Sequence, residues 1–373
     1  MSEPADLSGI VIGGGFALAF VFGAVANKTN FCTMGAISDV VNMGHWGRVR
    51  MWLLAIAVAI VGTTALGTAG LVDLSKAVVQ RPTIAWLSLL FGGGVFGVGM
   101  TMAGGCANKN LVRAGGGSLR SVVVLVFMGL AAYMTMRGLF AQWRASFLDP
   151  VAIDLGAAGW SDQGLGSALA RATGLAPATA LWIVAAAIAG VLAAFALKDA
   201  RFRANTAQWA GGIAIGLVIV GGWYVSGHLG YGEHPETMEN VFFATNTRAL
   251  ESMSFVGPVA WSLELLLLWT DASLHLSFGI ASVLGVIAGS AAVALATGRF
   301  RWEGFADFAD LRQQLVGALL MGFGGITALG CTVGQGLSGL STLAIGSFIA
   351  VAGIVGGSVA WLKYTLWRED QDG

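Results

Sequence analysis

Charged residues are scarce in this chain. Only 11% of its 373 residues are Asp, Glu, Lys or Arg, whereas soluble domains carry roughly 25%. The 20 basic and 20 acidic residues balance, so no basic surplus predicts a nucleic-acid partner. Because 56% of the residues are hydrophobic, the composition instead predicts an all-α polytopic membrane protein surrounded by the lipid bilayer.

Cysteine is rarer still. The chain has three cysteines, an odd number, with no CxxC pair, which argues against a zinc site and against a disulfide framework. No Ser/His/Asp grouping, His-rich cluster or pair of carboxylates lies within an apolar run, so we predict no catalytic residue, metal site or cofactor. The first six residues lack the basic region of a cleavable signal peptide.

Long apolar runs are abundant. A helix needs about 20 mostly apolar residues to span a bilayer, and nine segments meet this length. The predicted spans are residues 7–26, 48–69, 84–103, 118–139, 179–197, 207–226, 274–297, 311–329 and 340–363.

Four segments between these spans are too polar, too short or too rich in glycine to cross the membrane. They are residues 27–44, 104–117, 239–270 and 330–339. If they lie at membrane depth, their backbone must be buried in protein or line a cavity, so we expect short re-entrant helices. Residues 143–178 contain aspartates and prolines and are expected to form an exposed connection.

A glycine-rich motif that ends in cysteine occurs twice. It runs Gly97-Val98-Gly99, five residues, Gly105-Cys106, and returns 225 residues later (331 − 106) as Gly322-Phe323-Gly324, five residues, Gly330-Cys331. Each copy follows a predicted span and precedes a short polar run. A thiol within a glycine-rich break at membrane depth, present in two copies, is therefore the feature that a function must explain.

The two copies predict an internal repeat. Spans one to four and six to nine form two units with the fifth between them, so the second unit enters the membrane from the opposite side, as in many secondary transporters. The predicted division is residues 1–142 as the first repeat, residues 143–204 as a connection with a linking span, and residues 205–373 as the second repeat. A weak alignment of glycines places Gly230 opposite Cys32.

Basic residues are distributed unequally between the two sides of the membrane. Of the 20 Lys and Arg residues, thirteen fall on the side opposite the N-terminus and six on the N-terminal side, with Lys28 omitted as re-entrant. The positive-inside rule then predicts an N-terminus outside and a C-terminus in the cytoplasm.

The three cysteines are the principal candidates for binding a substrate. Cys32, Cys106 and Cys331 each lie at a polar, glycine-flanked break. A buried cysteine often acts only as a small hydrophobe, but a thiol is also a weak donor and a polarizable group that can contact a sulfur-bearing anion without holding it tightly. Several modest sites in a row suit permeation, and the start of a short helix favours an anion.

Four polar residues near the cysteines complete the predicted site. Asn30, Asn108 and Gln335 either donate amide hydrogens to a substrate or satisfy the broken backbone. Lys109 either attracts anions or extends its ammonium group to the membrane surface.

The motifs resemble those of the YeeE/YedE family of sulfur-compound transporters. The resemblance rests on Asn30-Phe31-Cys32, on Gly104-Gly105-Cys106-Ala107 and above all on Gly330-Cys331-Thr332-Val333-Gly334-Gln335-Gly336. It implies nine spanning helices with short re-entrant helices, and uptake of thiosulfate across the bacterial inner membrane past the three cysteines. It also implies a small cytoplasmic sulfur carrier of the TusA type as a partner.

Two other functions compete with transport of thiosulfate. One is a membrane-embedded sulfurtransferase-like enzyme that uses Cys331 or Cys106 as a nucleophile beside a cation such as Lys109. The other is a docking subunit for a cytoplasmic sulfur carrier that transports nothing. The sequence does not separate thiosulfate from sulfite, sulfide or selenium analogues.

Overall fold

Helices make up most of the protein. The computed structural model describes residues 4–234, 237–305 and 307–372, and within them the strands are four short segments in two antiparallel pairs. The predicted all-α class is confirmed. The first part of the chain forms α1 (Pro4–Thr29), α2 (Thr33–Met43), α3 (Gly47–Thr68), α4 (Trp86–Met102), α5 (Ala107–Gly115) and α6 (Leu119–Arg137).

The rest of the chain continues this pattern. The middle part forms α7 (Leu139–Phe147), α8 (Leu165–Thr173), α9 (Pro177–Leu197) and α10 (Ala200–Ala204). The last part forms α11 (Thr206–Tyr224), α12 (Val256–Leu267), α13 (Phe278–Ala296), α14 (Phe308–Thr327), α15 (Ile345–Asp372) and the π-helices η4 (Val225–Leu229) and η5 (Gly334–Gly339).

Short elements lie in the connections. They are the 3₁₀ turns η1 (Leu74–Lys76), η2 (Val78–Gln80) and η3 (Gly156–Ala158), the pair β1 (Thr83–Ile84) and β2 (Ile153–Asp154), and the pair β3 (Tyr231–Glu233) and β4 (Asn240–Phe242). Thr83 pairs with Asp154, so the predicted exposed connection is attached to the loop that precedes α4.

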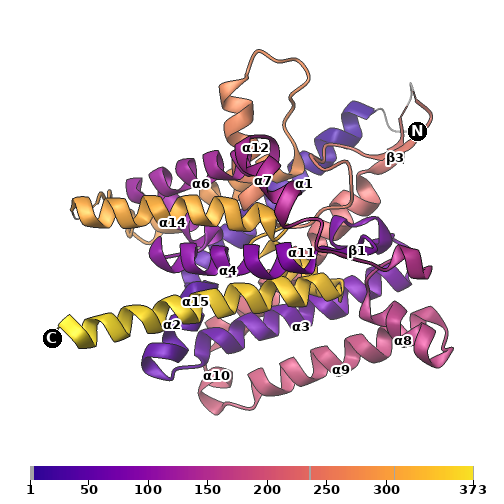
Figure 1. Cartoon of the computed structure of the whole chain (residues 1–373), viewed down its shortest axis with the longest axis horizontal. Coiled ribbons are helices and arrows are strands. Elements are labelled where there is room, and N and C mark those ends of the chain that lie inside the picture. Colours follow the sequence, from indigo (N-terminus) through magenta and orange to yellow (C-terminus); the bar gives the residue numbers. More distant parts are fainter. Residues whose placement is uncertain (1–3, 235–236, 306, 373) are drawn as a thin grey trace.

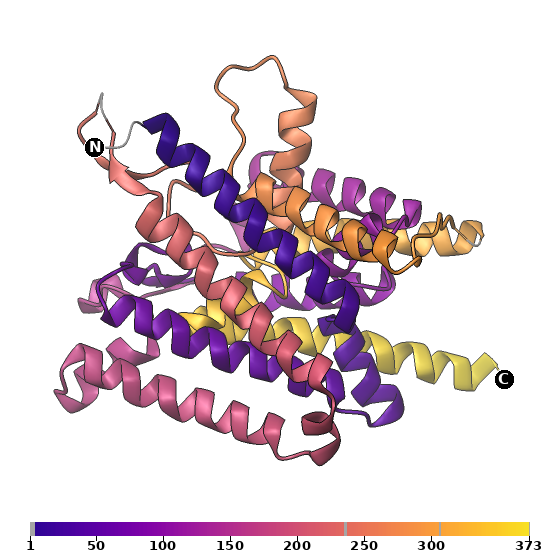
Figure 2. The same cartoon turned by 180° about the vertical axis from the view of Figure 1, so that it is seen from behind.

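Each of the nine predicted spans coincides with a long helix: α1, α3, α4, α6, α9, α11, α13, α14 and α15. In the described residues, eight helical runs are long and apolar enough to cross a bilayer, which makes this a multi-pass membrane protein. The exception among the nine is α14, a 20-residue helix with polar first turns. It nevertheless packs against α4 and α6. The start of α1 and the end of α15 lie at opposite ends of the bundle (Figures 1 and 2).

The helix contacts repeat when the two halves of the chain are exchanged. Helix α1 packs along α13 and α11 along α3, while α4 packs along α15 and α14 along α6. Helix α2 contacts α3, α4 and α15, and its counterpart α12 contacts α13, α14 and α6. This pattern supports our proposed division into repeats of residues 1–142 and 205–373 joined by residues 143–204.

The contact pattern corrects the predicted counterpart of Cys32. Because α12 takes the place of α2, the residue equivalent to Cys32 lies just before α12, beside Ser254, and not at Gly230. Gly230 directly follows η4, which continues α11. Residues 230–255, including β3 and β4, separate η4 from α12, and this insertion obscured the match in the sequence.

Glycines let the paired helices approach at backbone distance. On α1, a Cβ added at Gly23 would collide with the carbonyl oxygen of Val286 on α13. On α13, a Cβ added at Gly289 would collide with the carbonyl oxygen of Phe20 on α1. Close backbone approach through small residues is the usual source of helix association in membranes, where lipid removes the hydrophobic driving force.

We expect Gly289→Ala to destabilise the protein. The added methyl group would collide with backbone atoms of Phe20, which cannot move aside as a flexible side chain can. The cost is roughly 1–3 kcal/mol, as for other overpacked sites. Gly190→Ala on α9 is the matched control, since a Cβ there meets nothing within 4 Å and alanine favours a helix. Thermal unfolding in detergent should show a lower midpoint for Gly289→Ala alone, and equal midpoints for the two variants would contradict the packing argument.

Candidate functional site

The backbone forms the same turn before each of the three cysteines. The residue two positions before each cysteine is left-handed: Asn30 at φ 54°, Gly104 at φ 66° and Leu329 at φ 56°. A hydrogen bond then joins the next residue to the carbonyl five residues earlier. These bonds are Phe31 N to Ala26 O at 3.2 Å, Gly105 N to Met100 O at 2.9 Å and Gly330 N to Gly325 O at 2.8 Å. This is the Schellman helix ending, which satisfies backbone carbonyls that a broken helix would leave unpaired.

Each cysteine starts a new short helix. Cys32 is the N-cap of α2 and its sulfur accepts the N–H of Gly35 at 3.4 Å, while Cys106 is the N-cap of α5. Cys331 precedes η5 and accepts the N–H of Gly334 at 3.4 Å. The three thiols therefore lie at the positive ends of helical turns, where negative charge is stabilised.

The structure buries all three cysteines and brings their breaks together. The exposed fractions are 5% for Cys32 and 0% for Cys106 and Cys331, and all three are free thiols. The Cys32 and Cys106 side chains contact each other. Thr332, which follows Cys331 in the chain, lies beside the Cys106 thiol. None of the three cysteines faces lipid, and the second repeat meets the first at Cys106.

Asn108 and Gln335 make different use of their amides. The Cys106 thiol donates to Oδ1 of Asn108, but the Nδ2 donor of Asn108 is buried and has no partner in the described part of the chain. In Gln335 both ends are occupied, because Nε2 donates to the carbonyl of Ala328 at 2.8 Å and Oε1 accepts from Ser347 at 2.7 Å. The geometry of Gln335 thus matches the alternative in which it satisfies the broken backbone.

Lys109 joins the first two breaks. Its ammonium group donates to Oδ1 of Asn30 at 3.1 Å, and it lies close enough to Cys32 and Cys106 to act on them electrostatically. Asn30 therefore has two structural functions, as the left-handed residue of its turn and as the acceptor for Lys109. A positive charge is in this way placed next to two thiols.

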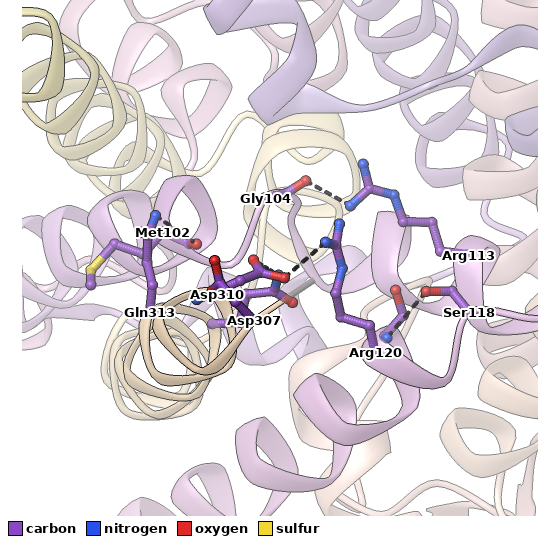
Figure 3. Close-up of polar contacts among 10 residues, drawn as sticks. Met102, Gly104, Arg113, Ser118, Arg120, Asp307, Asp310 and Gln313 are labelled. Carbon is purple, nitrogen blue, oxygen red and sulfur yellow. Dashed lines mark hydrogen bonds and ion pairs between the residues drawn. The ribbon is translucent and has the colours of Figure 1, made fainter. Parts of the chain in front are cut away.

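Arg113 fixes the turn that precedes Cys106. Its Nη1 donates to the carbonyl oxygen of Gly104 at 2.9 Å (Figure 3). Nearby, Arg120 of α6 forms an ion pair with Asp310 of α14 at 3.2 Å, also drawn in Figure 3. The Arg113 bond thus joins the last turn of α5 to the turn before Cys106, and the Arg120–Asp310 pair joins the first turns of α6 and α14.

A cavity of about 260 Å³ extends from the loops around Arg144 and Glu251 to the break that contains Cys331. Ser254 and Gly330 line it within the bundle, and Arg144 and Glu251 line it toward the loops. Arg144 forms an ion pair with Asp149 at 3.3 Å, and burial raises the pKa of the Glu251 carboxyl. The cavity ends at Gly330 and Gly334, which flank Cys331 and Thr332 in the chain.

Several residues of this centre were not predicted from the sequence. Thr332 and Ser254 carry hydroxyl groups too common in membrane helices to stand out. The sequence did hold one signal, the dipeptide Cys-Thr, which occurs as Cys32-Thr33 and as Cys331-Thr332.

We expect the oxidant diamide to link Cys32 to Cys106, because their thiols are in contact, and to leave Cys331 as a free thiol. Mass spectrometry of peptides from the oxidised protein measures this directly. Cys331→Ala should give the same link, whereas Cys32→Ser and Cys106→Ser should give none. A link that involves Cys331 in comparable yield would contradict the arrangement.

Comparison with known proteins agrees with these features. Two proteins named thiosulfate transporter TsuA align with nearly the whole chain. The protein of Spirochaeta thermophila is 27% identical over 378 residues, which cover 94% of this chain and 98% of its own. The protein of Escherichia coli is 26% identical over 374 residues, which cover 96% and 94%.

The family described as Sulphur transport matches residues 28–360, a region that contains all three cysteines and both glycine-rich motifs. The chain therefore belongs to this sulphur-transport family, and the resemblance to YeeE/YedE proteins seen in its motifs is confirmed.

Proposed function

We propose that the protein takes up thiosulfate, or a closely related sulfur anion, across the bacterial inner membrane along a path lined by Cys32, Cys106 and Cys331. The observation that carries the proposal is the burial of three free thiols at the starts of helical turns, with Cys32 beside Cys106 and with Thr332, the neighbour of Cys331, also beside Cys106. Membership in the sulphur-transport family and the TsuA relatives support sulfur transport as the general activity.

The chemistry of the site suits a passing anion. Thiols interact weakly with sulfur, and the helix starts and Lys109 supply positive potential, so the anion is attracted without being trapped. The cavity above Cys331 provides an entrance, and the Lys109–Asn30 contact marks the other end of the path. Several modest sites in sequence let each step be reversible, as conduction requires.

Proteoliposomes that contain only this protein provide the decisive experiment. Accumulation of labelled thiosulfate supports a transporter that needs no other component. A sulfurtransferase-like enzyme or a docking subunit for a TusA-type carrier would accumulate none. In the proposal such a carrier acts afterwards, on the cytoplasmic side, and its presence in the vesicle lumen should raise accumulation without being required for entry.

Replacing the cysteines tests whether sulfur contacts guide the anion. We expect Cys106→Ala and Cys331→Ala to lower uptake at least tenfold, the loss expected for roughly 1.4 kcal/mol or more of transition-state contact. Cys331→Ser should remain largely inactive, because serine keeps a donor of similar shape but lacks the polarizable sulfur.

The readout is the initial rate of thiosulfate uptake, normalised to protein that elutes as the native species in size exclusion. Wild-type rates in both alanine variants would show that the cysteines are only small buried hydrophobes. High activity in Cys331→Ser would show that any hydrogen-bond donor suffices.

The proposed orientation places the N-terminus outside and the C-terminus in the cytoplasm. A cysteine introduced at the exposed Asp154 should then react with an impermeant thiol reagent added to intact spheroplasts, and one at the exposed Arg299 should react only after lysis. The unsubstituted protein is the control, since its own thiols are buried. The opposite labelling pattern would overturn the orientation.

A further inference from the structure

We propose that Thr332 and Asn108 bind the oxygen atoms of the transported anion, so that the site selects an anion that carries both a terminal sulfur and a sulfonate group. The inference rests on the proposed function and specifies its substrate. The thiols of Cys32 and Cys106 contact the terminal sulfur, while the hydroxyl and amide donors contact the oxygens.

Thr332 presents a buried hydroxyl that lies within reach of the Cys106 sulfur but makes no hydrogen bond of normal geometry in the described part of the chain. The residue is 1% exposed, and its Oγ1 has no hydrogen-bond partner among the described residues. It lies beside the Cys106 thiol and directly after Cys331. Buried hydroxyl groups are almost always hydrogen-bonded, so an unpaired one next to two candidate binding residues indicates a missing partner.

Asn108 presents a second unused donor at the same thiol. The residue is 0% exposed, its Oδ1 accepts from Cys106, and its Nδ2 finds no partner in residues 4–234, 237–305 and 307–372. Because an amide nitrogen only donates, its missing partner must be an acceptor. Asn108 belongs to the first repeat and Thr332 to the second, so the two donors approach Cys106 from different halves of the protein.

The two kinds of donor suit the two ends of one anion. Oxygen atoms of a sulfonate are strong acceptors that prefer O–H and N–H donors, and charge on the acceptor strengthens such bonds. A terminal sulfur is larger and more polarizable, and a thiol is the matching group. Sulfide lacks the oxygens and sulfite lacks the terminal sulfur, so each would use only part of the site.

Thr33 provides a matched control. It follows Cys32 as Thr332 follows Cys331, and its buried Oγ1 likewise has no partner within the described residues. However, Thr33 lines a separate apolar cavity of about 220 Å³ between α2, α3 and α15. Thr33→Val therefore removes an equivalent hydroxyl that does not lie at Cys106.

The experiment measures thiosulfate uptake by proteoliposomes in the absence and presence of sulfide. We expect Thr332→Val, which preserves shape, to raise the KM for thiosulfate about tenfold, the loss of one hydrogen bond to a charged group. Thr332→Ser should keep the wild-type KM, and so should Thr33→Val. Inhibition by sulfide should not weaken in Thr332→Val, because sulfide has no oxygens to lose.

Asn108→Asp is a second, independent variant that keeps the acceptor for Cys106 while it removes the donor and adds a negative charge. We expect it to abolish uptake while the protein retains its melting midpoint in detergent. This variant keeps the inference testable if Thr332→Val does not assemble.

Two results would overturn the inference. One is a wild-type KM in Thr332→Val, or wild-type uptake in Asn108→Asp. The other is a Thr332→Val protein that loses affinity for thiosulfate and for sulfide by the same factor, since that indicates a structural defect. If the wild-type protein accumulates no thiosulfate, the proposed function itself fails. If the wild-type protein accumulates thiosulfate and the cysteine variants are inactive, but Thr332→Val transports normally, only this inference fails.

Discussion

The fold depends on how backbone can be interrupted inside a membrane. Every N–H and C=O group at that depth needs a protein partner, because no water is available to pair with it. The protein meets this need three times with the same helix ending, in which a left-handed residue lets an N–H reach the carbonyl five residues back. Since the cysteine follows this turn at a constant offset, the backbone that repairs the break also determines where each thiol points.

This repeated ending explains why glycine occupies one of the three left-handed positions and why Leu329 is strained at another. Gly104 adopts the left-handed conformation at no steric cost, and Asn30 tolerates it. Leu329 occupies the same position in the second repeat, where an ordinary side chain costs roughly 1–2 kcal/mol. The surrounding helices impose the turn there, since Gly330 N still bonds to Gly325 O at 2.8 Å and Gln335 bonds to the carbonyl of Ala328.

The sequence predicted the spans and the breaks that precede the three cysteines, because apolar length and glycine-cysteine motifs are local properties. It failed where the information is tertiary. The counterpart of Cys32 was misplaced to Gly230, since residues 230–255 separate η4 from α12 and only the packing of α12 against α6 and α13 reveals the match. The partners of Gln335 and the unpaired hydroxyl of Thr332 likewise follow from folding, as neither has a pattern in the sequence.

The two proposed repeats differ in the side chains that they bring to one centre, and in the proposed function this difference makes the two ends of the anion's path unlike. The first repeat supplies Cys32, Cys106, Asn108 and the charge of Lys109, whereas the second supplies Cys331, Thr332 and the cavity lined by Ser254. Ser254 lies just before α12, where the first repeat has Cys32, so in the proposed function the entrance is richer in hydroxyl groups and the exit is richer in thiols. An anion with a sulfonate end and a sulfur end can exchange one set of contacts for the other as it moves. In the proposed function, the similarity of the two repeats therefore builds the path, and the departures from symmetry make its two ends chemically different.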